Sequence, residues 1–155
     1  MADSSHRFVR RMNRVRLPLL VFIVLTISAT YWFLMFLGTH WPMPPSMGFN
    51  VSDKLQHALG YAGLGFWLLA SGRLWWQRGV RVALLALAVG AAYGVLDELT
   101  QMLVPNRSAD VLDWVADVVG LLLGIAAFTV LDLLLLRKAA FADRSAAQAA
   151  WGRST

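Results

Sequence analysis

Four long apolar stretches alternate along the chain with short polar segments. A helix needs about 20 apolar residues to cross the hydrocarbon core of a bilayer, where the backbone finds no hydrogen-bonding partner outside the helix. The stretches therefore predict four membrane-spanning helices, at about 17–38, 54–72, 82–104 and 110–136. This pattern predicts an all-α integral membrane protein that folds as a four-helix bundle.

Basic residues gather on one side of the predicted membrane. Of the fourteen Lys and Arg residues, twelve precede the first span, connect the second to the third, or follow the fourth, and only Lys54 and Arg107 fall on the other side. Because Lys and Arg near span ends are retained in the cytoplasm, both termini are expected there (N-in/C-in), as in a multi-pass protein of the cytoplasmic (inner) membrane. The predicted organisation is a basic cytoplasmic N-terminus at 1–16, a transmembrane domain at 17–136 and a cytoplasmic tail at 137–155.

The basic start of the chain, followed by an apolar run, also resembles a cleaved signal peptide. The apolar residues continue as far as Leu37, however, which is longer than the apolar region of such a peptide. We therefore expect the first helix to remain in the protein.

Composition narrows the chemistry of the chain. Apolar residues make up 58% of the 155 residues and charged residues 15%, so the bilayer is the expected partner. The net charge of +5 does not indicate nucleic acid, because the basic residues lie in short segments between spans and form no single surface. The absence of Cys excludes disulfides, thiolate metal sites and cysteine nucleophiles.

Ionisable residues on three of the predicted spans lie at one depth. With a helical rise of about 1.5 Å per residue, His57, Asp97 and Asp117 all fall roughly 6 to 10 Å below the outer surface. Spacings of three or four residues place the polar residues of each span on one face. These faces must line the bundle interior or a water-filled cavity, since charge facing lipid is costly. The pattern predicts a polar pocket that opens outward.

Ordinary structural roles account for part of this set. Asp53 with Gln56 resembles a capping box, and Ser108 or Asp110 is a candidate cap for the fourth span. Lys54 and Arg107 are available for ion pairs with the acids. Six acids against two bases nevertheless leave four excess negative charges at the outer ends, and unpartnered carboxylates take up protons or bind cations.

Pairs of glycines spaced four residues apart occur in the third and fourth spans. They are Gly90 with Gly94, and Gly120 with Gly124. Small residues at this spacing let helices approach closely. We expect them to pack the third span against the fourth, which would bring Asp97 near Asp113 and Asp117.

The polar residues between about 50 and 125 resemble a known family. The motifs are Asp53-Lys54-x-x-His57-x-x-x-Tyr61, then Asp97-Glu98-x-x-Gln101, then Arg107-Ser108-x-Asp110-x-x-Asp113 followed by Gly120. Their order, spacing and apolar setting are similar to the VanZ-like family. This resemblance implies a polytopic membrane protein whose namesake is associated with resistance to the glycopeptide teicoplanin. It implies no settled biochemical activity.

The resemblance singles out the same residues as the depth argument. The candidates for lining a ligand-binding pocket are Asp53, Lys54, His57, Tyr61, Asp97, Glu98, Gln101, Arg107, Asp110, Asp113 and Asp117. Asp117 departs from the Asn that is more typical of the family at its position. The departure adds a negative charge to the predicted pocket.

Our first hypothesis for the function is a binding protein. The pocket would recognise an envelope lipid, a glycan intermediate or a lipophilic glycopeptide-type drug, and so affect envelope physiology or antibiotic tolerance. The acids would hold an amine or a divalent ion, while Arg107 and Lys54 would contact phosphate oxygens. No cofactor is predicted under this hypothesis, and oligomerisation is left open.

The second hypothesis is an enzyme that acts on a lipid-linked envelope substrate. In it, His57, Asp97, Glu98 and Asp113 bind a divalent cation that activates water. The chain contains no phosphate-binding loop and no serine-centred nucleophile motif, so the sequence favours this hypothesis less than the first. A third hypothesis is an ion-paired structural bundle or a proton-coupled carrier. Apart from Asp132, the inner halves of the spans lack the ionisable groups that a proton path would need.

Overall fold

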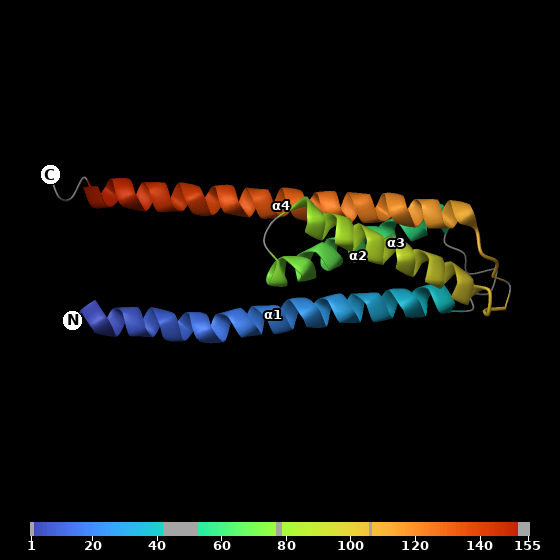
Figure 1. The fold of residues 1–155 in the computed structure, drawn as a ribbon, viewed down its shortest axis with the longest axis horizontal. Helices are drawn as coiled ribbons and strands as arrows, with labels where there is room; N and C mark the ends of the chain where they lie inside the picture. The colour runs from blue at the N-terminus through green and yellow to red at the C-terminus, as the bar shows by residue number, and fades with distance from the viewer. Residues whose placement is uncertain (1, 42–52, 77–78, 106, 152–155) are drawn as a thin grey trace.

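The protein is a bundle of four helices that run up and down in turn, so that consecutive helices are antiparallel and α2 and α4 are parallel (Figure 1). The computed structural model describes residues 2–41, 53–76, 79–105 and 107–151. The helices are α1 (Ala2–His40), α2 (Asp53–Trp75), α3 (Val80–Gln101) and α4 (Val111–Trp151). Helix α1 begins and helix α4 ends at the same end of the bundle, on the left in Figure 1. At the other end of the bundle, α1 and α3 end and α2 and α4 begin.

Helix α1 begins at Ala2, well before the predicted span, and two further helix ends differ from the prediction for local reasons. Helix α3 ends at Gln101, not at 104, because the chain turns there: the N–H groups of Leu103 and Val104 donate to carbonyls three residues back, before Pro105. Helix α4 continues through the predicted tail to Trp151. Its last segment is rich in Ala, which has the highest helix propensity, and projects beyond α2 and α3 (Figure 1).

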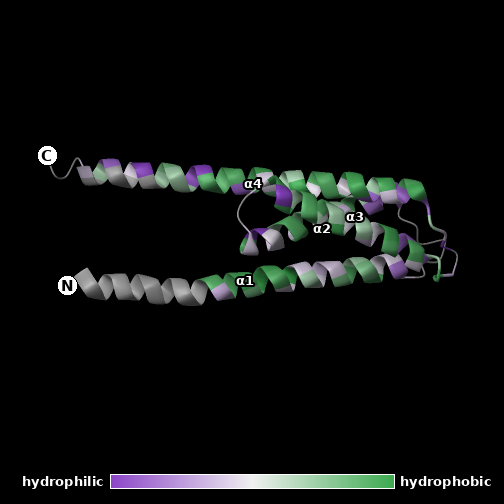
Figure 2. Ribbon diagram, viewed as in Figure 1, coloured by the Kyte–Doolittle hydropathy of each residue, from purple (hydrophilic) through white to green (hydrophobic). Residues whose placement is uncertain are grey.

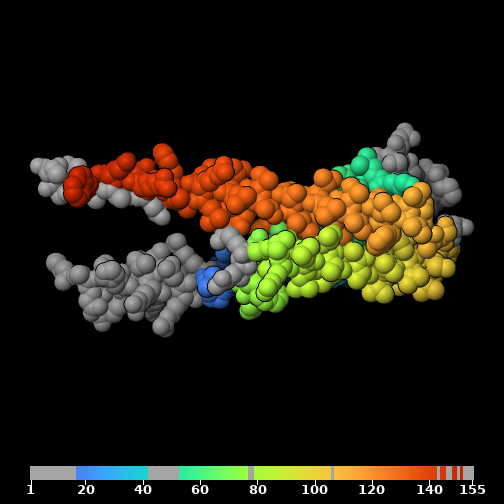
Figure 3. Space-filling view, turned by 45° about the horizontal axis from the view of Figure 1, so that its top comes forward, coloured from blue at the N-terminus to red at the C-terminus, as the bar shows by residue number. Residues whose placement is uncertain are grey.

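Helix α2 is the centre of the bundle. It packs against each of the other three helices, most extensively against α4, whereas α1 and α4 do not touch within the described residues. Figure 3 shows the side of the molecule on which α3 and α4 lie along each other. A helix in this central position contributes least to the lipid-facing surface, so it tolerates the polar residues that made the second span the weakest by sequence.

Glycines set the close approach of α2 and α4. A methyl group at Gly120 would overlap the backbone carbonyl of Ala58, and one at Gly124 would overlap that of Ala62. The prediction that this pair packs against the third span was therefore wrong: both glycines face α2. Gly90 and Gly94 do face α4, where they accommodate the side chains of Leu121, Trp114 and Asp117.

The surface of the bundle is apolar and its interior is partly polar. Figure 2 shows that hydrophobic residues predominate along much of the four helices, and large apolar side chains such as Phe22 and Leu123 are exposed. Segments of three helices are long and apolar enough to cross a membrane, at Leu17–His40, Val80–Gln101 and Val111–Ala142. Exposed apolar surface around buried ionisable groups is the arrangement expected in a bilayer. The chain is an all-α membrane protein.

Candidate functional site

Buried polar side chains gather at the end of the bundle where α1 and α3 end and α2 and α4 begin (Figure 1). They come from three helices, and they are His57, Asp97, Glu98, Gln101, Asp113 and Asp117. All six are among the residues predicted to line the pocket. The structure thus brings the ionisable residues of α2, α3 and α4 to one layer.

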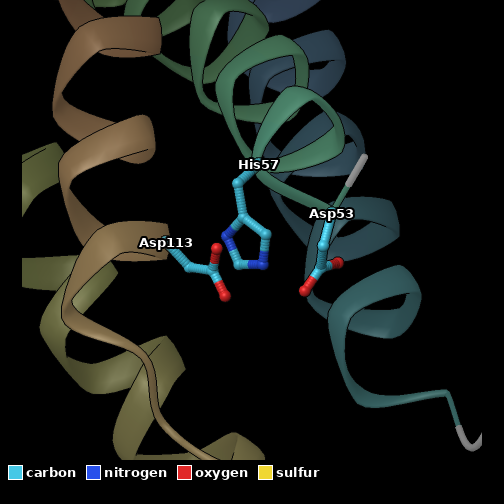
Figure 4. A group of neighbouring side chains, drawn as sticks. All are labelled: Asp53, His57 and Asp113. Atoms are coloured by element: carbon cyan, nitrogen blue, oxygen red, sulfur yellow. The ribbon is translucent and has the colours of Figure 1, made fainter. Parts of the chain in front are cut away.

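His57 is the centre of this cluster. Its Nδ1 shares a hydrogen bond of 2.9 Å with Oδ1 of Asp117 and lies 3.9 Å from Oε1 of Glu98. Figure 4 shows its imidazole lying between the carboxylates of Asp53 and Asp113. Acids from α2, α3 and α4 therefore surround one imidazole ring.

The close packing of α2 on α4 explains why His57 meets Asp117. Ala58, whose carbonyl lies against Gly120, directly follows His57, and Gly120 lies three residues after Asp117. Gly94 makes room on the third side, because a Cβ there would come within 3.2 Å of Oδ2 of Asp117. Three small residues therefore let three backbones converge around one buried carboxylate.

Lys54 joins α2 to the start of α4. Its Nζ donates to Oδ2 of Asp110 at 2.9 Å and to Oδ1 of Asp113 at 2.8 Å. This pairing satisfies Asp113, which is largely buried, and leaves Lys54 about half exposed. Lys54 therefore has the ion-pairing role that the sequence suggested for it.

Asp110 is the N-cap of α4, as one of the two sequence alternatives proposed. Its Oδ1 accepts the N–H of Leu112 at 2.8 Å, and its own N–H donates to Oε2 of Glu98. The Leu112 N–H and the ammonium of Lys54 lower the pKa of the Asp110 carboxyl below its ordinary value, because both stabilise the ionised form. The cap therefore also ties the end of α3 to the start of α4.

Asp97 points toward α1, not toward the acids of α4. Its carboxylate accepts hydrogen bonds from Gln101 Nε2 at 2.8 Å and Thr39 Oγ1 at 2.9 Å. His40 lies close by, with Nε2 2.9 Å from Oγ1 of Thr100. Sequence reasoning missed Thr39 and His40. Their signal was present, since both fall at the outer end of the first span, at the level of the cluster.

A cavity of about 400 Å³ opens between α1 and α2, beside the cluster. Its apolar wall includes Leu34 and Met35 of α1, and its polar wall includes Asp53, His57 and Arg107. Tyr61 also borders it, and the Tyr61 hydroxyl is buried without a hydrogen-bond partner in the described part of the chain. Four of the predicted pocket residues therefore line the cavity: Asp53, His57, Tyr61 and Arg107. Lys54, Asp110 and Asp113 form an ion-paired group that is not part of the cavity lining.

The comparison with protein families decides which family the chain belongs to. A family model described as VanZ/LLP1 matches residues 3–134, most of the chain. The chain belongs to the VanZ/LLP1 family. The match confirms the resemblance drawn from the motifs and extends it from the motif region to α1 and the first half of α4. No curated protein and no solved structure gives a significant match to the chain.

Proposed function

We propose that this VanZ/LLP1 protein binds an amphipathic envelope lipid in the cavity between α1 and α2. The observation that carries the proposal is the composition of the cavity, in which an apolar wall from α1 faces the ionisable side chains of Asp53, His57 and Arg107. A volume of about 400 Å³ is within the range of small-molecule sites, roughly 300 to 1,000 Å³. A site with one apolar and one ionisable wall suits a ligand with one apolar and one charged end.

Each end of such a lipid would have its own set of contacts in the cavity. Arg107 is suited to a headgroup phosphate, because a guanidinium donates several hydrogen bonds in a fixed geometry. Asp53 is suited to an amine in the same headgroup. Leu34 and Met35 would contact the acyl chain, which Met accommodates readily because its side chain is unbranched. Retention of the lipid, and not chemistry upon it, is the function that these residues support.

The proposal includes an orientation in the cytoplasmic membrane with both termini inside. The start of α1 and the end of α4 lie at one end of the bundle (Figure 1), and Arg73, Arg81 and Arg137 lie toward it. Basic residues near span ends favour the cytoplasmic side. The cavity would then open toward the outer leaflet, where a bound envelope lipid or the lipophilic part of a glycopeptide would reach it. An effect on glycopeptide tolerance would follow from this location.

The direct experiment is to measure lipid that remains bound after extraction in mild detergent. Native mass spectrometry of the wild type should show a retained lipid, and Arg107→Gln should lower its occupancy, because the phosphate loses its guanidinium partner. Arg137→Gln is the matched control, since it removes the same charge from a position far along α4, toward the end of the bundle where the chain termini lie. Equal lipid occupancy in Arg107→Gln and Arg137→Gln would contradict the proposal.

A further inference from the structure

Three buried side chains in the cluster place potential metal-binding atoms together. They are His57 from α2, Glu98 from α3 and Asp117 from α4, and their ligand atoms all lie within 4.8 Å of one another. The residues are 6%, 6% and 0% exposed. Each comes from a different helix, so the group depends on the packed bundle and not on the spacing within one segment.

Two buried carboxylate oxygens in the group have no hydrogen-bond partner in the described part of the chain. They are Glu98 Oε1 and Asp117 Oδ2. Glu98 is fixed by its other oxygen, Oε2, which accepts the N–H of Asp110, and this leaves Oε1 3.9 Å from His57 Nδ1. Buried carboxylate oxygens in folded proteins are nearly always satisfied, so these two oxygens are available to a cation that enters the group.

The charges of the group lead to the same conclusion. Two carboxylates face one imidazole, and even a protonated imidazole leaves one negative charge without compensation. Lys54 does not supply the missing charge, because its ammonium donates to Asp110 and Asp113. The nearby group of Asp53, His57 and Asp113 is a weaker candidate for the same reason, since Lys54 already compensates Asp113.

We infer that His57 Nδ1, Glu98 Oε1 and an oxygen of Asp117 form a binding site for one divalent transition-metal ion, of the Zn²⁺ or Mn²⁺ class. Imidazole suits Zn²⁺ and carboxylates suit Mn²⁺, whereas Mg²⁺ prefers oxygen ligands and keeps several waters. Ligands at about 2.0 to 2.2 Å from an ion lie roughly 3 to 3.5 Å apart. His57 Nδ1 lies 2.9 Å from Asp117 Oδ1 and 3.9 Å from Glu98 Oε1. To bind one ion, the Asp117 oxygen would move slightly away from Nδ1 and the Glu98 oxygen slightly toward it.

The remaining edge of His57 faces a second carboxylate (Figure 4). With Nδ1 on the metal, Nε2 carries the proton, and this edge of the ring faces the Asp53 carboxylate (Figure 4). A carboxylate that accepts this second N–H is the usual outer partner of a metal-bound histidine. The inferred ligand set differs from the one expected from sequence: Asp117 is included, whereas Asp97 and Asp113 are left out because they accept hydrogen bonds from Gln101 and Lys54.

The test is the metal content of the full-length chain in mild detergent. The protein is stripped with EDTA, incubated separately with Zn²⁺, Mn²⁺ or Mg²⁺, passed over a desalting column and analysed by inductively coupled plasma mass spectrometry. The expected result is one Zn²⁺ or Mn²⁺ per chain and little Mg²⁺. Glu98→Gln and Asp117→Asn should weaken binding by more than the about 10-fold to 100-fold loss typical of an outer-shell partner.

Asp97→Asn is the matched control, because Asp97 is a buried acid of the same helix that lies outside the inferred ligand set. It should retain the metal, with folding of every variant checked by size-exclusion chromatography. Zn²⁺ X-ray absorption of the wild type, which needs no variant, should show scattering from one imidazole ring. No stoichiometric metal in the wild type, no imidazole scattering, or an equal loss in Asp97→Asn would each overturn the inference. Lipid retention is a separate readout, so failure here leaves the proposed function standing.

Discussion

His57 Nδ1 and Asp117 Oδ1 lie 2.9 Å apart across the interface of α2 and α4, and both side chains are buried. The contact depends on the glycines of α4, which let the two backbones meet. It also places an ionisable pair beside the cavity, since His57 is one member of the pair and also lines the cavity. His57 therefore takes part in the helix interface, in the buried ionisable pair and in the proposed ligand site.

The helix interface can be tested with Gly124→Ala. The added methyl group would overlap the carbonyl of Ala62, so α2 and α4 must move apart. Overpacking of this kind costs typically 1 to 3 kcal/mol, about the loss expected here. Thermal unfolding in detergent should show a lower Tm. Gly38→Ala is the control, because a Cβ at Gly38 meets nothing within 4 Å, and it should leave the Tm unchanged or slightly raised.

Replacement of Lys54 tests the ion-paired group. Lys54→Gln removes the cation from Asp113, which is only 9% exposed in its side chain, and a buried charge that loses its partner is destabilising. We expect the Tm to fall by a few degrees. The double variant Lys54→Gln/Asp113→Asn should recover part of the loss, because the unpaired charge is gone. A double variant that loses the full sum of both single losses would show that the two residues act independently.

Filling the cavity tests the lipid site without a change in charge. Gly38 borders the cavity, and there is open space around the position of its Cβ, so Gly38→Leu should occupy volume without disturbing the helices. Retained lipid should fall while the Tm stays near that of the wild type. Ala127→Leu, at an exposed position on α4, is the control and should retain the lipid. Full retention in Gly38→Leu would place the lipid elsewhere.

The orientation can be measured because the chain has no cysteine. Ser108→Cys places a thiol at the end where the cavity opens, and Ser145→Cys places one at the opposite end of α4; both positions are exposed. In intact cells, a membrane-impermeant maleimide should label Ser108→Cys and spare Ser145→Cys until the membrane is permeabilised. The reverse labelling pattern would overturn the proposed orientation.

Hydropathy and helical rise were sufficient to predict four helices and a shared layer of ionisable groups. The length of an apolar run and the depth of a residue along its helix can both be counted from the sequence of that one helix. His57, Asp97, Glu98, Asp113 and Asp117 all prove to be buried at one end of the bundle. The cap at Asp110 was also predictable, because capping is local.

The rotation of each helix about its axis was not predictable in the same way. The sequence shows that Gly120 and Gly124 share a face, but not whether that face meets α2 or α3. Their packing against α2 directs Asp117 to His57, and Asp97 is left to pair with Thr39 of α1. The partners within the layer follow from these contacts between helices, which no spacing along one helix specifies.

The central claim is that a lipid occupies the cavity between α1 and α2, and photo-crosslinking tests it most directly. A phospholipid with a diazirine near the carbonyl end of its acyl chain would be incorporated into nanodiscs with the wild type, irradiated and mapped by peptide mass spectrometry. The account predicts labelling of the α1 segment that contains Leu34 and Met35, reduced in Gly38→Leu. Labelling confined to the lipid-facing surface of α4, unchanged in that variant, would contradict it.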